Sequence, residues 1–163
     1  MANFSTARTP PHRGDLPLQQ DLLRELEQAH VRLNDCMSEM DEATRERVPD
    51  CFRYTRARFM LSSASLARRQ LFNSICEHLF PLLSLADVPR VQSLQQADRE
   101  LLGLSAKHVA QWTSDTVQCD WPGYCRASRQ IRKHMRDALD SELRVLAPLL
   151  QRHGCDGRKR QFQ

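Results

Sequence analysis

The chain has 163 residues, a length that suits one domain with a sizeable hydrophobic core. It has only five glycines, and Leu, Ala, Arg, Glu and Gln outnumber β-branched residues, which predicts an all-helical fold. The net charge of +4 comes from the ends, because residues 16–150 carry 18 Lys and Arg against 18 Asp and Glu. A neutral body with a short basic tail argues against nucleic-acid binding.

The ends of the chain and its cysteines indicate the organisation and the compartment. Residues 1–15, which contain Pro10, Pro11 and Gly14, are expected to form a mobile arm; residues 16–152 form the folded domain and residues 153–163 a short basic tail. No apolar run approaches a membrane span and no signal peptide begins the chain, so we expect a cytoplasmic protein without a membrane partner. The six cysteines form no CxxC pair and are expected to be reduced thiols.

The first two amphipathic segments are predicted at about residues 16–42 and 51–80, separated by a turn at Pro49 and Asp50. In the first, His30 lies at the edge of the apolar stripe. Pro81 is expected to end or kink the second segment. Steps of three and four residues predict the stripe of the second segment, which consists of Met60, Ala64, Ala67, Leu71, Ile75 and His78.

The third and fourth segments are predicted at about residues 90–112 and 121–152. Asp120 is expected to cap the start of the fourth segment and Gly154 its end. The stripe of the third segment consists of Leu94, Ala97, Leu101, Leu104, His108 and Trp112. Trp112, Trp121 and Tyr124 are expected to form a hydrophobic plug. Four amphipathic segments with short connections predict an up-down-up-down four-helix bundle.

Glu142 lies within the apolar arc of the fourth segment, where a carboxylate is unfavourable unless it finds a partner. Each segment thus presents one residue that can bind a metal: His30, His78, His108 and Glu142. Such side chains on facing helices build iron and manganese sites. The alternative is four independently satisfied polar residues near helix ends or partly exposed edges. The arginines of the second segment are expected to form a solvated face, with Arg68 as a candidate to neutralise a buried acid such as Glu142 instead.

At these residues the chain resembles the hemerythrin-like, or HHE-type, cation-binding helical bundles. The matching stretches are LEQAHVRL around His30, LARRQLFNSICEHLFPLL around His78, LSAKHVAQW around His108, and ALDSELRVLAPLL with Glu142. The family places a carboxylate four residues after the second-helix His and a His four residues before the last Glu. Leu82 and Ala138 stand at those positions here. The resemblance therefore implies an incomplete metal site, with either no cofactor or iron, and argues against a bridged two-iron centre.

The heights of these residues along the helices set a second condition on a metal site. Counting about 1.5 Å per residue from the predicted turns places His78 about 15–20 Å below His30. The same count puts His108 level with His30, and Glu142 level with His78. His134 would lie near the height of His30 and His108, at the flank of its stripe. The count therefore predicts two half-sites rather than one metal cluster.

Cys119 and Cys125 flank the start of the fourth segment, where the helix dipole favours a thiolate at Cys125. They are either a redox-sensing thiol pair or loop disulfide, or two ordinary reduced cysteines.

The sequence favours a binding or regulatory module with an unknown protein partner, monomeric or homodimeric, over a catalyst. One alternative is a mononuclear non-haem iron protein that senses or reacts with O2 or NO through His30, His78, His108 and Glu142. A further alternative is a homodimeric packing protein, which an exposed apolar stripe on the segment 51–80 would indicate.

Overall fold

The computed structural model describes residues 15–159, with side chains described for residues 19–152. These residues form helices and no strand, which confirms the predicted all-α class. The predicted arm falls almost wholly outside the described residues, as does the end of the basic tail. The elements in chain order are α1 (Asp15–Ala43), α2 (Cys51–Leu79), the 3₁₀ turn η1 (Phe80–Leu82), α3 (Val88–Gln111), α4 (Ser114–Cys119) and α5 (Trp121–Lys159).

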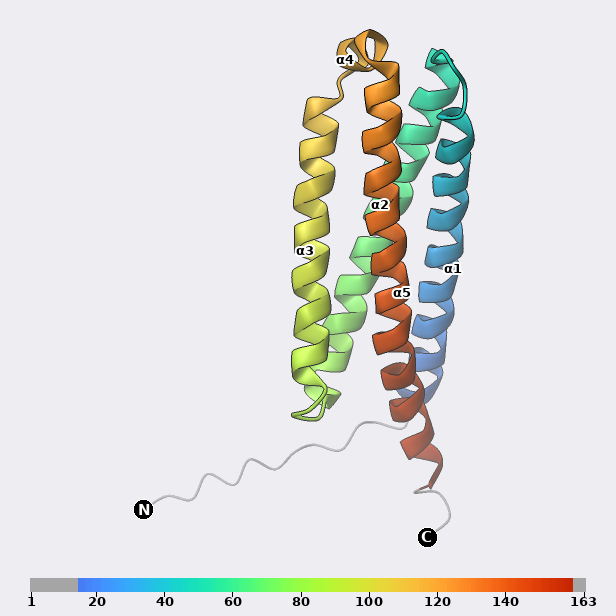
Figure 1. Ribbon diagram of the computed structural model, residues 1–163. Helices are drawn as coiled ribbons and strands as arrows, with labels where there is room; N and C mark the ends of the chain where they lie inside the picture. Colours follow the sequence, from blue (N-terminus) through green and yellow to red (C-terminus); the bar gives the residue numbers. More distant parts are fainter. Residues whose placement is uncertain (1–14, 160–163) are drawn as a thin grey trace.

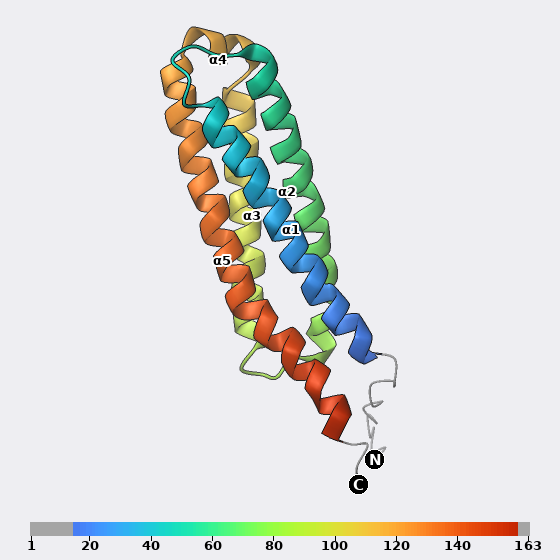
Figure 2. The same cartoon turned by 90° about the vertical axis from the view of Figure 1, so that its right-hand side faces the viewer.

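The long helices α1, α2, α3 and α5 lie side by side, and each runs opposite to the long helix before it (Figures 1 and 2). α1 packs closely against α2 and α5, and α3 packs closely against α5. α2 and α3 are not a closely packed pair. Figure 1 shows the reason: α2 is inclined to the others and crosses behind α5. α2 and α3 are therefore farther apart at the α4 end of the molecule than at the opposite end (Figure 1).

Local capping side chains set the starts of α2 and α5, and the cap of α5 is the predicted one. Asp50 accepts a hydrogen bond from the backbone N–H of Arg53 at 3.0 Å and caps α2. Asp120 accepts from the backbone N–H of Gly123 at 2.8 Å and caps α5. The sequence analysis missed α4, which crosses the end of the molecule and is capped by Thr113.

The predicted end of the last helix near Gly154 is wrong, because α5 continues to Lys159. A glycine ends a helix when it adopts a left-handed conformation, and no described residue has a positive φ. A glycine that stays right-handed only lowers the helix propensity.

The apolar core consists of two clusters, one above the other. The upper cluster contains the predicted aromatic plug: Trp121 and Tyr124 stack with centroids 5.6 Å apart, Trp112 meets Tyr124 edge-on, and Tyr54 joins them. The lower cluster is built from aliphatic side chains and one aromatic ring, including Leu26, Phe72, Ile75, Leu94, Leu146 and Leu149.

Two predicted stripes are displaced in the structure. The buried residues of α2 include Ile75 of the predicted stripe, but Met60 and Ala67 are exposed; the buried set is Tyr54, Ala57, Leu61, Arg68, Phe72, Ile75, Cys76 and Leu79. On α3, Leu104 is 45% exposed, and Asp98 is buried whereas its neighbour Ala97 is exposed. A shift of one residue turns a helix face by about 100°. The prediction failed because Arg68 and Asp98 read as outward-facing residues, although both point into the core.

Candidate functional site

A layer of four buried polar side chains, one from each long helix, separates the two apolar clusters. Its members are His30, Arg68, Asp98 and Glu142, and each is between 2% and 7% exposed. Along every long helix the layer residue lies between a residue of the upper cluster and one of the lower cluster. These flanking pairs are Leu26 and Leu33, Leu61 and Phe72, Leu94 and Leu101, and Leu139 and Leu146.

Arg68 is the centre of this layer. One of its guanidinium nitrogens donates to Glu142, and the other donates to Asp98 at 2.5 Å. The second oxygen of Glu142 lies 2.9 Å from Nε2 of His30. Asp98 is also 3.3 Å from Nε of Arg69, as an ion pair without hydrogen-bond geometry. Arg68 therefore pairs with Glu142, which is one of the two interpretations that the sequence left open for this arginine.

The charges of the layer compensate one another. Two carboxylates face two guanidinium groups, so a neutral His30 leaves the layer without net charge. With the proton on Nε2, His30 donates to Glu142, and its Nδ1 has no partner among the described residues. The nearby thiol shows how strongly this region disfavours further negative charge. Burial first, and then the charges of Glu142, Asp98 and Glu77, raise the pKa of Cys76 to about 12.

The structure brings together two of the four predicted metal ligands, His30 and Glu142. His108 instead stacks on Tyr124, with ring centroids 5.8 Å apart, and His78 lies near the far end of α2. From their distances to the helix ends, the three histidines occupy three levels roughly 15 Å apart. The prediction that His108 lies level with His30, and Glu142 level with His78, was wrong. Heights that are counted along the chain through several turns add up the error in the length of each connection.

The side chains around Glu142 do not fit an iron ion. Among the residues whose side chains are described, no group of three or more His, Cys, Asp or Glu could hold a metal. Both oxygens of Glu142 are already engaged by Arg68 and His30. Ala138 and Leu82, where the hemerythrin-like pattern has ligands, are only half-buried. His134 is exposed.

The two predicted redox cysteines are separate free thiols. Cys119 is exposed at the end of α4, whereas Cys125 is 9% exposed in the first turns of α5. Burial raises the pKa of Cys125, and the opposing effect of Arg129, Arg132 and Arg126 is smaller. This is the direction opposite to the one that the helix dipole predicts. Desolvation therefore outweighs the dipole at this thiol.

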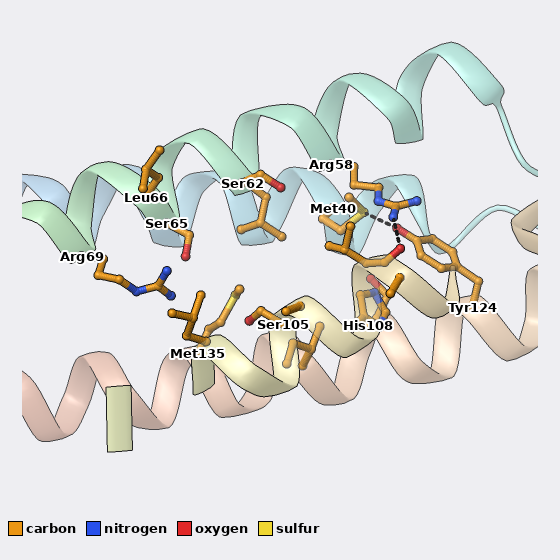
Figure 3. Close-up of a pocket in the computed structure, with 17 residues that line it drawn as sticks. Met40, Arg58, Ser62, Ser65, Leu66, Arg69, Ser105, His108, Tyr124 and Met135 are labelled. Atoms are coloured by element: carbon orange, nitrogen blue, oxygen red, sulfur yellow. Dashed lines mark hydrogen bonds between the residues drawn. The ribbon is translucent and has the colours of Figure 1, made fainter. Parts of the chain in front are cut away.

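A groove of about 450 Å³ opens between α2 and α3, above the polar layer. Its lining is mostly apolar, with floor residues from α1 and α5 such as Met40, Tyr124, Ile131 and Met135. Figure 3 shows Arg58, Tyr124 and His108 at one end of the groove and Arg69 at the other, with Ser62, Ser65 and Ser105 between them. This groove was not predicted from the sequence. The feature that could have indicated it is the small side chains on the two facing helices, which are Ser62, Ser65, Ser105, Ala106 and Ala110.

The Arg58 end of the groove is positively charged and polar. The guanidinium lies 5.9 Å from the centroid of Tyr124 and makes a long hydrogen bond, 3.5 Å, to the carbonyl of Val109. Burial lowers the pKa of His108, and the charges of Arg58 and Arg132 lower it further. His108 is therefore protonated less readily than an exposed histidine. The hydroxyl of Ser105 is buried in the wall of the groove without a partner among the described residues.

Comparison of the chain with models of known protein families, with curated proteins and with solved structures gives no match. Within the part of the chain that the structure describes, none of the helices combines the length and the apolar character needed to cross a membrane. Only the arrangement of the side chains therefore indicates a function for this protein.

Proposed function

We propose that this chain is a helical binding module that holds an apolar ligand in the groove between α2 and α3. The observation that carries the proposal is the groove itself. Its volume of about 450 Å³ lies within the range of small-molecule sites, about 300–1,000 Å³. Its lining also has their character, because apolar walls surround a few polar groups.

The polar layer has a structural role in this proposal. We propose that the four long helices form an up-down-up-down four-helix bundle of the hemerythrin-like kind, in which Arg68 supplies the positive charge that a metal ion would otherwise supply. Two observations support this: His30 on α1 faces Glu142 on α5, and Arg68 binds Glu142 directly. A layer with no open coordination position and no nucleophile supports binding or regulation rather than catalysis.

The proposal is tested with Nile red, an uncharged dye whose fluorescence rises in apolar surroundings. We expect saturable binding by the wild-type protein and its loss in Ala106→Trp, because Ala106 lines the groove on α3 and the indole would fill it. Ala97→Trp is the matched control, since Ala97 is an exposed alanine of the same helix that does not line this groove. The proposal fails if wild type does not bind the dye or if Ala106→Trp binds it equally well.

A second candidate function is homodimerisation through α2, which a row of exposed apolar side chains favours. Phe52, Phe59 and Leu66 follow one another at steps of seven residues and are 80%, 68% and 54% exposed. Seven-residue spacing is that of a coiled-coil seam. The charge of α2 argues against this dimer. Residues 51–76 contain five arginines and no acidic residue, so two copies of α2 would repel each other.

Light scattering coupled to size exclusion decides between monomer and dimer. If the row forms an interface, the wild-type mass is that of a dimer and Phe59→Glu gives a monomer. Leu85→Glu, a change at a 94% exposed leucine in the loop before α3, leaves the dimer intact. A monomeric wild type removes this candidate.

A further inference from the structure

The two arginines at the ends of the groove differ in what they bind. Arg69 is 3.3 Å from Asp98 and belongs to the compensated charge layer. Arg58 makes no ion pair with any described residue, and no Asp or Glu lines the groove. A half-buried guanidinium without a counter-charge is favourable only when it keeps water or gains an anion. The charge of the site is therefore concentrated at the Arg58 end.

We propose that the ligand of this groove is a single-chain amphiphile with an anionic head, whose carboxylate binds Arg58 and whose alkyl chain extends along the apolar floor towards Met135. The inference rests on the proposed function and adds the chemical class of the ligand. Charge complementarity selects the head group, because the guanidinium of Arg58 is the unmatched charge at the groove. The unpartnered hydroxyl of Ser105 is a further polar group in the wall.

The dimensions of the groove select one thin chain. From Arg58 to Arg69 the groove follows eleven residues of α2, or about 16 Å. Its volume of 450 Å³ spread over that length leaves a cross-section much narrower than a helix, whose diameter is about 10–12 Å. An extended chain advances about 3.5 Å per three bonds, so roughly a dozen carbons span the groove.

Other occupants fit less well. A peptide helix would have to separate α2 from α3 before it could enter. A second copy of the chain would bring another arginine-rich α2 towards Arg58. A cationic amphiphile would meet Arg58 and Arg69 with no carboxylate in the lining to attract it.

The test measures decanoate and decanol binding by isothermal titration calorimetry below their aggregation limits. Wild type is expected to bind decanoate about tenfold more tightly than decanol. Arg58→Gln removes most of that preference, because decanoate loses a charge-assisted contact and decanol only a neutral one. Arg58→Lys keeps most of the preference because the charge remains. Arg56→Gln is the matched control, since Arg56 is an exposed arginine of α2 that does not line the groove.

A chain-length series gives an independent measurement. From hexanoate to decanoate, each added methylene is expected to tighten binding about three- to fourfold. The gain is expected to stop once the chain exceeds about a dozen carbons, where the groove reaches Arg69.

The outcomes separate this inference from the proposed function. The apolar groove is supported if decanol binds and Ala106→Trp blocks its binding. In that case the anionic head group is wrong if decanoate is not preferred over decanol, or if Arg56→Gln has the same effect as Arg58→Gln. If neither ligand binds, or Ala106→Trp leaves both unaffected, the groove is not a binding site and both proposals fail. If Arg58→Gln loses the preference for decanoate and Arg56→Gln keeps it, both the proposed function and this inference are supported.

Discussion

The polar layer and the groove each contain an arginine of α2, but the two arginines have opposite surroundings. Arg68 is 2% exposed and donates to two carboxylates from two other helices. Arg58, ten residues earlier, is half-buried beside apolar side chains and has no carboxylate partner among the described residues. The layer closes the core by satisfying its own charges, whereas the groove keeps an unsatisfied charge next to empty apolar space. This difference is the basis for proposing a structural role for the layer and a binding role for the groove.

The largest effect is expected from breaking the layer at Arg68. Arg68→Met leaves Glu142 and Asp98 buried without their main partner, and should lower the free energy of unfolding by about 3–5 kcal/mol. Urea denaturation, monitored by circular dichroism, measures this loss of unfolding free energy. Arg56→Met, on the exposed face of α2, should stay within about 0.5 kcal/mol.

The same experiment can show that the cost comes from uncompensated charge. In the triple variant Arg68→Met, Asp98→Leu, Glu142→Leu, the half-buried Arg69 is the only remaining cation among the described residues that loses a carboxylate partner, so most of the lost stability should return. A loss below about 1 kcal/mol in Arg68→Met alone would contradict the assignment of a structural role to the layer.

A smaller loss is expected at the edge of the layer. His30→Leu removes the donor to the second oxygen of Glu142 and leaves Arg68 in place, so the free energy of unfolding should fall by about 1–3 kcal/mol. His134→Leu is the matched control, because His134 is an exposed histidine of α5. Equal urea midpoints for the two variants would mean that the contact of 2.9 Å between His30 and Glu142 contributes nothing.

A solvent-exposed position on α3 should tolerate an added atom that the buried layer would not. A Cβ at Gly103 on α3 would meet no other atom within 4 Å. Gly103→Ala should therefore stabilise the protein by about 0.5–1 kcal/mol, because alanine loses less backbone freedom in a helix. Thermal unfolding measures the gain, and a lower melting temperature would show that α3 packs more tightly there than the structure indicates.

The smallest effect concerns pH. Burial, and then Arg58 and Arg132, lower the pKa of His108, so the unfolded chain binds a proton more readily than the folded one. Stability should be complete above the unfolded value of about 6.5 and fall as the pH drops through the lower, folded pKa. Urea midpoints between pH 7.5 and pH 5 should fall less in His108→Gln than in wild type. An identical fall in both proteins would exclude His108 as a source of the dependence.

Several signals that act within a few residues were read correctly from the sequence, although the expected cap at Gly154 was not. Asp120 was identified as a helix cap and Asp50 as part of a turn, and α2 and α5 begin at the predicted Cys51 and Trp121. The aromatic plug followed from three large rings at the end of the predicted helices. α4 was missed because six residues are too few for a periodic pattern.

The candidate sites were predicted only in part. The unfavourable position of Glu142 on an apolar arc correctly indicated a buried partner, and Arg68 was one of the partners considered. Asp98 was missed, since a single Asp among polar residues of α3 has no local mark of burial. His78 and His108 were placed in the core by stripes that lie elsewhere on the helix surface or at other heights.

The sequence by itself determined that the folded part of the chain is mainly helical, where several of the helices begin, and that Glu142 needs a counter-charge. These properties depend on hydrogen bonds and periodicities within one helix. The tertiary structure alone decided that Arg68 and Asp98 meet Glu142, and that α2 leaves a groove beside α3. Those outcomes depend on the rotation, height and inclination of whole helices. The packing of all the side chains together sets these three quantities, and the sequence of one segment does not determine them.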